Sequence, residues 1–229
     1  MVRNHFCELV ICSLLAVSSI STQAATITQL TISDGATTIL AVDNGVGDTN
    51  SIAGVLELSA SVGNFDVNVA TGFSTPALGT PSLPVLDLSS VNFTSTTGGT
   101  LTVMLTTTGL TGPLPLADPL LEAGGTTDGS VHIESFIDPG NTAFGIGTST
   151  GIVSSTGSGS FSGTDNGGLV GLGLSVPYSA TIVATVVHTN AGDISNIGAV
   201  YRIVPEPSTA ILFVSSLAII MRRKSAEKV

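Results

Sequence analysis

The sequence predicts a mainly β protein: an antiparallel β-sandwich ectodomain of jelly-roll kind, followed by a single C-terminal transmembrane helix. Two features of the body predict the sandwich, namely short runs of alternating apolar and polar residues and the Gly-, Pro-, Asn- and Asp-rich turns between them. An apolar run followed at once by basic residues near the C-terminus predicts the helix. We therefore expect a leader over residues 1–24, a sandwich over residues 25–203 and a terminal segment over residues 204–229.

The first 24 residues have the pattern of a secretory signal peptide. A short cationic start containing Arg3 precedes a mostly apolar stretch from Phe6 to Ile20, and the small side chains of Thr22 and Ala24 precede a cleavage point. We expect the Sec translocon and signal peptidase to act on this leader. Both cysteines of the chain lie within it, so cleavage after Ala24 leaves no thiol, which excludes disulfides, thiolate metal sites and cysteine nucleophiles.

The body from Ala25 to Ile203 is strongly acidic. It contains 13 Asp and Glu residues and a single cation, Arg202, which gives a net charge of −12. A surface with this charge repels phosphate backbones, so nucleic acid is excluded as a partner.

Alternating runs predict the strands of the sandwich. The clearest run extends from Ser179 to Thr189, where Ala180, Ile182, Ala184 and Val186 share one face. The other predicted strands are Ile27–Ile32, Thr38–Val42, Val55–Val62, Leu86–Phe93, Leu101–Thr107, Ser130–Ile137 and Ala199–Val204.

Three segments between these runs are rich in loop-forming residues. Gly72–Pro84 and Gly109–Gly129 contain several prolines and are predicted to be long loops. Gly145–Gly168 is almost entirely Gly, Ser and Thr, a composition that fits either a weak strand or a flexible linker.

The C-terminal segment is predicted to enter a membrane. From Ile203 to Met221 the chain would form roughly 28 Å of helix, close to the thickness of a bilayer core. Because proline interrupts a helix, the secure part is Ser208–Met221. The basic residues Arg222, Arg223 and Lys224 follow at once and favour the cytoplasmic side, which places the body outside.

This terminal pattern resembles the PEP-CTERM sorting signal of exported bacterial proteins. The motif consists of Val204, Pro205, Glu206, Pro207 and Ser208, and the apolar helix and the basic cluster follow it in order. The resemblance implies that an exosortase recognises the motif and processes the chain after transient anchoring in the inner membrane. It also implies a final location at the cell surface or outside the cell, in an envelope of Gram-negative type, with exopolysaccharide or biofilm matrix as a partner. A single-span tail anchor with a proline-containing linker is the alternative.

Catalytic candidates in the body are weak. Ser149 lies in a G-x-S-x-G pattern, but Gly and Ser are abundant here and no predicted helix follows, as a nucleophile elbow requires. His132 and His188 are the histidines of the mature body, and each is expected to be a structural strand residue. We assign no catalytic residue, cofactor or metal ligand.

Calcium is the one ion for which the sequence offers donors. The turns Asp43–Asp48 and Asp165–Asn166 supply oxygen ligands, although their spacing matches no EF-hand loop. Since tight turns favour the same residue types, a purely structural role is the main expectation.

Two classes of function therefore stay open. The favoured one is a non-enzymatic surface or matrix protein that is structural or binds polysaccharide. The alternative is a secreted polysaccharide-active hydrolase or lectin-like enzyme of the same fold, in which Glu122, Glu134 and Asp138 would supply a carboxylate pair. The body has no Trp, and its only tyrosines are Tyr178 and Tyr201, which weakens the case for aromatic sugar platforms in either class.

Overall fold

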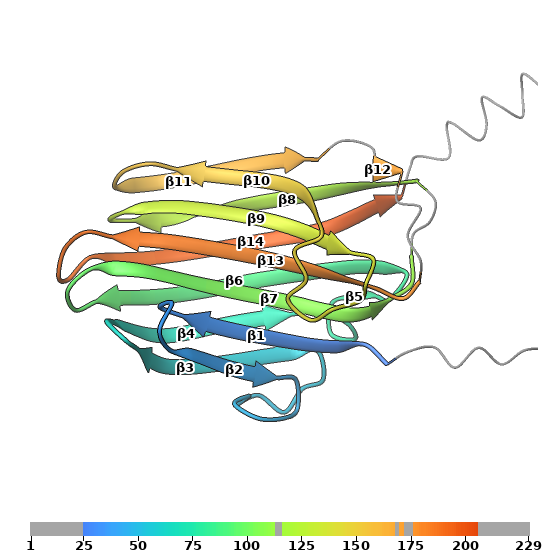
Figure 1. Cartoon of the computed structure of the whole chain (residues 1–229), viewed down its shortest axis with the longest axis horizontal. Helices are drawn as coiled ribbons and strands as arrows, with labels where there is room; N and C mark the ends of the chain where they lie inside the picture. Colours follow the sequence, from blue (N-terminus) through green and yellow to red (C-terminus); the bar gives the residue numbers. More distant parts are fainter. Residues whose placement is uncertain (1–24, 113–115, 168–169, 172–175, 206–229) are drawn as a thin grey trace, which may run out of the picture.

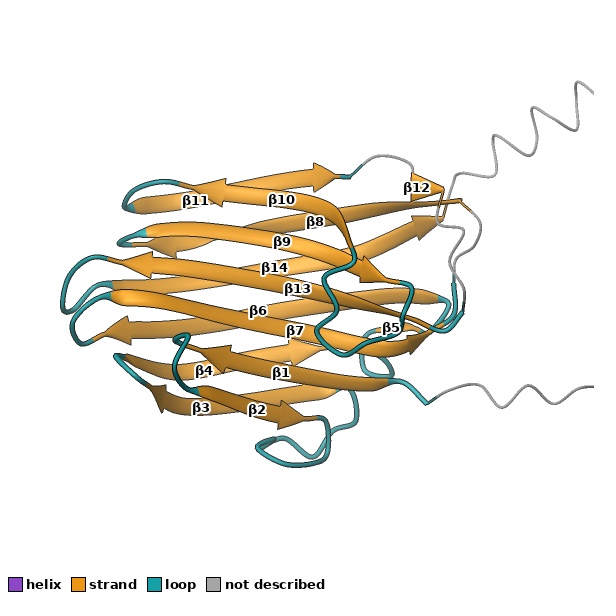
Figure 2. Ribbon diagram, viewed as in Figure 1, coloured by secondary structure: helices purple, strands orange, loops and turns teal. Residues whose placement is uncertain are grey.

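The computed structural model describes residues 25–112, 116–167, 170–171 and 176–205, and this part of the chain is built from antiparallel strands. Figure 2 shows strands and loops, with no helix among these residues. The expected leader, the Glu206–Ser208 part of the sorting motif, the Ser208–Met221 helix and the basic cluster lie outside the described residues. Within the described ranges, no helix has the length and apolar character needed to cross a membrane.

Fourteen strands are present in the described residues. In chain order they are β1 (Ile27–Ser33), β2 (Thr38–Val42), β3 (Val55–Val62), β4 (Phe65–Phe73), β5 (Gly79–Thr80), β6 (Leu83–Ser95), β7 (Gly99–Leu110), β8 (Leu116–Thr127), β9 (Ser130–Asp138), β10 (Thr148–Ser155), β11 (Gly159–Asn166), β12 (Val170–Gly171), β13 (Tyr178–His188) and β14 (Ile194–Pro205).

The strands form two sheets that pack face to face (Figure 1). Sheet A has the order β10-β9-β13-β7-β1-β2, and sheet B has the order β11-β8-β14-β6-β4-β3, with β12 beside β8 and β5 beside β6. Consecutive strands often lie in opposite sheets, as β6 and β7 or β13 and β14 do. The expected antiparallel β-sandwich is confirmed.

Strand pairing in the second half of the chain is nested. β6 pairs with β14, β7 with β13, β8 with β11 and β9 with β10, so each pair encloses the next in sequence. The first four strands extend this arrangement at one edge, because β1 pairs with β7 and β4 pairs with β6.

The core fills the space between the sheets, and the strand periodicity determines which residues enter it. Ala180, Ile182, Ala184 and Val186 on β13 are buried, as their alternation predicts. The largest fully buried side chains are Tyr178, Tyr201, Phe65 and Phe93.

One predicted loop is wrong. Gly109–Gly129 contains β8, a strand that pairs with β14 from Ala117 to Thr127. Pro119 is tolerated there because β11 pairs with Leu120–Thr127 and β12 with Leu116 and Ala117, so neither of these described strands needs the missing N–H of Pro119. The Gly145–Gly168 segment forms β10 and β11, so the weak-strand interpretation is the correct one there.

Acidic side chains protect two of the sheet edges. The carboxylate of Asp165 on β11 accepts a hydrogen bond from the backbone N–H of Ile152 on β10 at 2.7 Å, which joins the two edge strands across the sandwich. At the other edge, Asp48 accepts the N–H of Glu57 on β3 at 3.1 Å. Both contacts satisfy edge N–H groups that would otherwise be open to pairing with another chain.

β1 begins and β14 ends at the same end of the sandwich (Figure 1). The opposite end carries hairpin turns, several of which are fixed by aspartates. Asp34 accepts the N–H of Thr37 at 2.6 Å, and Asp193 accepts that of Asn190 at 2.9 Å. These backbone hydrogen bonds lower the pKa of both carboxyls.

Candidate functional site

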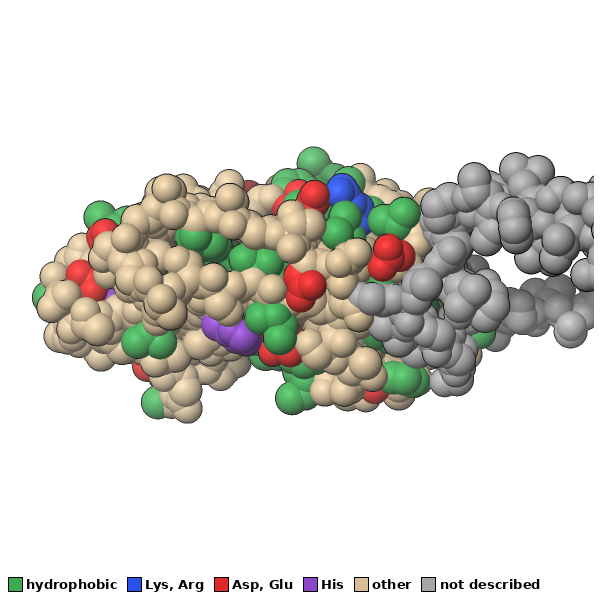
Figure 3. All heavy atoms as spheres, turned by 90° about the horizontal axis from the view of Figure 1, so that it is seen from above, with side chains coloured by type: hydrophobic (Ala, Val, Ile, Leu, Met, Phe, Trp, Pro, Cys, Tyr) green, Lys and Arg blue, Asp and Glu red, His purple; other side chains and the backbone are tan. Residues whose placement is uncertain are grey.

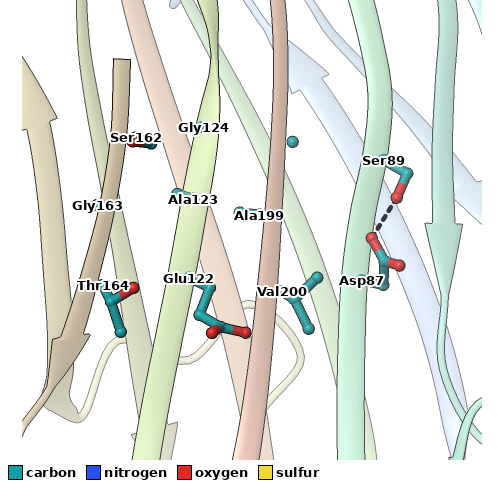
Figure 4. Close-up of a pocket in the computed structure, with 11 residues that line it drawn as sticks. Asp87, Ser89, Glu122, Ala123, Gly124, Ser162, Gly163, Thr164, Ala199 and Val200 are labelled. Carbon is teal, nitrogen blue, oxygen red and sulfur yellow. Dashed lines mark hydrogen bonds between the residues drawn. The ribbon is translucent and has the colours of Figure 1, made fainter.

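A shallow groove of about 470 Å³ lies on the outer face of sheet B. It crosses strands β11, β8, β14 and β6, which run side by side in Figure 4. Its lining consists of Asp87, Ser89, Glu122, Ala123, Gly124, Ser162, Gly163, Thr164, Gly198, Ala199 and Val200.

Two paired glycines form the floor of the groove. Gly124 on β8 lies directly opposite Gly198 on β14, so neither strand projects a side chain there. A Cβ added at Gly198 would have only the Leu88 carbonyl oxygen within 4 Å, at 3.6 Å, and thus open space above it. A glycine inside a strand marks a place where another group can approach the backbone closely.

Polar side chains stand on both sides of this floor. Ser162 and Thr164 rise from β11 on one side, and Asp87 and Ser89 rise from β6 on the other (Figure 4). The Ser89 hydroxyl donates a hydrogen bond to the Asp87 carboxylate.

A β-bulge in β6 sets the position of the β6 residues that line the groove. On β14, Ile197 pairs with Val91 and Ala199 pairs with Leu88, so two β6 residues, Ser89 and Ser90, stand opposite Gly198 alone. Ser90 has a φ of 53°, in the left-handed region that a bulge of this kind uses.

The single cation of the body lies beside the groove. Arg202 Nη2 is 2.7 Å from Glu122 Oε2, and 42% of each side chain is exposed. Glu122, Val200 and Asp87 form one row across three neighbouring strands, which places the backbones of the two acids about 10 Å apart.

This arrangement suits binding better than catalysis. The groove is open, and it offers hydroxyl and carboxylate groups around a backbone floor. Enclosure by apolar groups is one way in which a glycosidase keeps its general acid protonated, whereas Glu122 is ion-paired and partly exposed.

The carboxylates proposed for a hydrolase do not come together. Glu122 lies on sheet B, whereas Glu134 and Asp138 lie on β9 of sheet A. Glu134 contacts His132 at 3.3 Å, and Asp138 caps its own loop by accepting the N–H of Gly140 at 2.9 Å. That hydrogen bond is the main reason why the pKa of Asp138 is lowered.

Ser149 and His132 lie on sheet A, apart from the groove. Ser149 is an exposed residue of β10 opposite Phe136, and β11 follows that strand in place of a helix. His132 is exposed, with Nδ1 at 2.8 Å from the Ser154 hydroxyl. Neither arrangement supplies a nucleophile elbow.

His188 is a core residue. It is 2% exposed, and its ring nitrogens lie 3.0 Å from Ser95 Oγ and 2.7 Å from Ser195 Oγ. Ser195 in turn donates to Thr127 Oγ1 at 2.8 Å. Both serines are themselves buried, so this contact between serine and histidine is closed to a substrate.

The carboxylates of the acidic turns accept hydrogen bonds from backbone N–H groups. Asp48 accepts the N–H groups of Asn44, Asn50 and Glu57, and Asp43 accepts that of Gly54. Asp165 bonds to Ile152. Throughout the described part of the chain, no group of three or more His, Cys, Asp or Glu residues is arranged to hold a metal ion.

The groove residues were not singled out from the sequence. The sequence indicates Glu122 only as one carboxylate of a hydrolase pair, and its local pattern predicts no role for Gly124, Gly198 or Ser89. A signal was present in the two strand-interior glycines, but their pairing across β8 and β14 depends on the topology.

Two solved structures resemble the chain in fold. One is TmCBM61 in complex with β-1,4-galactotriose, with a TM-score of 0.34 and 13% identity over 60% of this chain and 86% of that one. The other comes from work on the promiscuous specificity of carbohydrate-binding modules of the β-sandwich superfamily, with a TM-score of 0.32 and 12% identity over 78% of this chain and 72% of that one. No protein-family model matches the sequence. No curated protein matches it either.

Proposed function

We propose that this protein is an exported, non-enzymatic binding protein of the cell surface or extracellular matrix, and that the groove on sheet B binds polysaccharide. The observation that carries the proposal is the groove itself, a polar depression with a glycine floor on the strands of sheet B. Sites on strands hold their geometry better than sites on loops.

The chemistry of the lining fits a sugar ring. The apolar face of a pyranose can lie against the backbone of Gly124 and Gly198 and against the Val200 side chain. Its hydroxyls can then donate to Asp87 and exchange hydrogen bonds with Ser162 and Thr164 at the sides. The alternative, a polysaccharide hydrolase, requires turnover in addition to binding.

We infer that the groove belongs to a jelly roll. The nested pairing of β6 to β11, β13 and β14 is that of eight strands wound as two Greek keys, and β1 to β4 widen the two sheets. The four strands under the groove are all of the jelly-roll strands in sheet B.

Filling the floor tests this site. Gly198→Val adds a side chain into open space on a strand and should leave the free energy of unfolding unchanged or raised. We expect it to weaken polysaccharide binding by at least about tenfold in affinity electrophoresis and calorimetry.

Thr102→Val is the control, because it makes the outer face of sheet A more apolar and leaves the groove on sheet B unchanged. Equal binding by wild type and Gly198→Val would refute the groove as the site. Release of soluble sugar during the same incubations would instead favour the hydrolase.

We also propose that the C-terminal segment is a sorting signal read by an exosortase. Val204 and Pro205, the first two residues of the motif, are also the last residues of β14, opposite Asp118 and Ala117, so the folded sandwich leads straight into the motif. The test is the intact mass of the protein isolated from its native host. A mature chain that ends near the motif is expected in wild type but not in Glu206→Ala, and a mature chain that still contains Met221–Val229 would contradict sorting.

A further inference from the structure

We infer that the groove selects neutral glycan chains over acidic ones, and that Arg202 enforces this selection by positioning Glu122. This inference rests on the proposed polysaccharide binding and names the class of ligand. Its basis is the placement of charge around the groove.

Acidic side chains line the groove, whereas the cation does not. Asp87 and Glu122 are lining residues, and Arg202 is outside the lining. Arg202 is also the only Lys or Arg between Ala25 and Ile203, a span with a net charge of −12. A uronate or sulfate group in the groove would therefore meet carboxylates, with no unpaired cation to bind it.

The ion pair engages the one cation near the groove and partly neutralises the charge that an acidic ligand would need. Arg202 Nη2 binds Glu122 Oε2 at 2.7 Å, from the row of side chains next to that of Glu122 and Val200. On the face shown in Figure 3, basic atoms form one small patch next to acidic atoms. Arg202 thus fixes the Glu122 carboxylate on the groove wall, where it can accept hydrogen bonds from sugar hydroxyls.

Asp87 is fixed in a similar way from the opposite side. The Ser89 hydroxyl donates to it, and the bulge at Ser89 and Ser90 sets the position of that hydroxyl. The groove therefore presents two oriented acceptors, one on each side of Val200, in the row of side chains next to the glycine floor. Neutral sugars carry the matching hydroxyl donors and no charge that the acids would repel.

The experiment compares neutral and acidic polymers on the full exported body. We would measure the affinities of wild type for neutral galactans and glucans and for alginate and polygalacturonate, at low and at moderate salt. Wild type should bind at least one neutral polymer and bind both acidic polymers at least about tenfold more weakly at low salt. This difference should shrink as salt screens the repulsion.

Four variants locate the selectivity. Asp87→Asn keeps the acceptor for Ser89 but removes one charge, so binding of acidic polymers should rise severalfold. Glu134→Gln removes one charge from the opposite sheet and should leave the ratio between the two classes unchanged. Arg202→Gln should weaken neutral binding severalfold, and Arg202→Lys should restore most of it.

The outcomes separate the two proposals. If no polymer of either class binds the folded protein, polysaccharide binding itself fails, and this inference fails with it. If acidic polymers bind as well as neutral ones at low salt, and Arg202→Gln abolishes their binding, the groove still binds polysaccharide, but its selectivity is the reverse of that inferred here.

Discussion

The imidazole of His188 stacks on the ring of Phe93, with the two centroids 5.3 Å apart and an angle of 27° between the planes. Phe65 packs against both rings, at 5.8 Å from His188 and 6.1 Å from Phe93. These residues come from β13, β6 and β4, so the cluster joins sheet A to sheet B near the hairpin end of the sandwich. A histidine serves here because its two nitrogens pair with buried serine hydroxyls while its ring packs like an aromatic core residue.

Removing the His188 ring should destabilise the fold. His188→Ala leaves a cavity and removes one hydrogen-bond partner from each of two buried serine hydroxyls, and we expect it to lower the free energy of unfolding by about 3 kcal/mol. Urea denaturation at neutral pH measures the change. His132→Ala on the exposed face of sheet A is the matched control and should change the free energy by less than about 0.5 kcal/mol. Equal effects of the two variants would contradict a core role for His188.

The same histidine should make the fold sensitive to acid. Burial lowers the pKa of His188 below its usual value of 6.5, although Asp193 and Asp128 oppose the shift. The unfolded chain then binds the proton more readily, so stability is fully present above about pH 6.5 and declines as the pH falls toward the pKa of the folded state. Urea midpoints measured from pH 7.5 to pH 5 should decrease in wild type and in His132→Ala. In His188→Asn this part of the decrease should disappear, and an unchanged slope in that variant would refute the assignment.

The two buried tyrosines should respond differently to loss of the hydroxyl. Tyr178 Oη donates to the Gly112 carbonyl at 2.5 Å, whereas the Tyr201 hydroxyl has no hydrogen-bond partner among the described residues. Thr150 lies close enough to Tyr201 to affect its pKa but bonds to Ser135 instead. Burial raises the pKa of both tyrosines.

Tyr178→Phe should therefore cost about 1 kcal/mol, and Tyr201→Phe should be neutral or slightly stabilising. Thermal and urea unfolding of the two variants provide the comparison. A larger loss in Tyr201→Phe than in Tyr178→Phe would show that the Tyr201 hydroxyl has a partner after all.

The Asp43–Asp48 turn should be structural and independent of calcium. Because Asp48 accepts three backbone N–H groups, Asp48→Ala should lower the free energy of unfolding by about 2 kcal/mol. Melting temperatures in calcium and in chelator should coincide for wild type. A rise in wild type with calcium, lost in Asp48→Ala, would instead identify this turn as an ion site.

The local sequence pattern was sufficient to predict the strands in which apolar and polar residues alternate strictly. β2 and β3 begin and end at the residues predicted from the sequence, and β13 differs from its prediction by one residue at each end. β11, in contrast, has a single large apolar residue, Phe161, and extends as a strand because the backbone of β8 pairs with it. Its conformation depends on a partner distant in the sequence.

The groove could not be predicted from the local sequence pattern, for a related reason. Gly124 and Gly198 form a floor only because β8 and β14 are neighbours in this register, and Ser89 reaches the groove only through a bulge opposite Gly198. The sequence contains these residues but not their pairing. Nested pairing joins segments far apart in the chain, so it cannot be deduced from the periodicity of either strand.

The position of β14 in sheet B affects how the molecule can be assembled. It is the last described strand, yet it lies between β8 and β6, with β11 beyond one and β4 beyond the other. A chain that emerges from a ribosome or a translocon with its N-terminus first therefore keeps these two groups of strands apart until the residues up to Pro205 have followed. Completion of sheet B then requires contacts between strands that are far apart in the sequence, and such contacts make folding slow. The newly emerged chain must stay soluble through this interval, and the mutual repulsion of its many carboxylates, with only one cation to offset them, favours that.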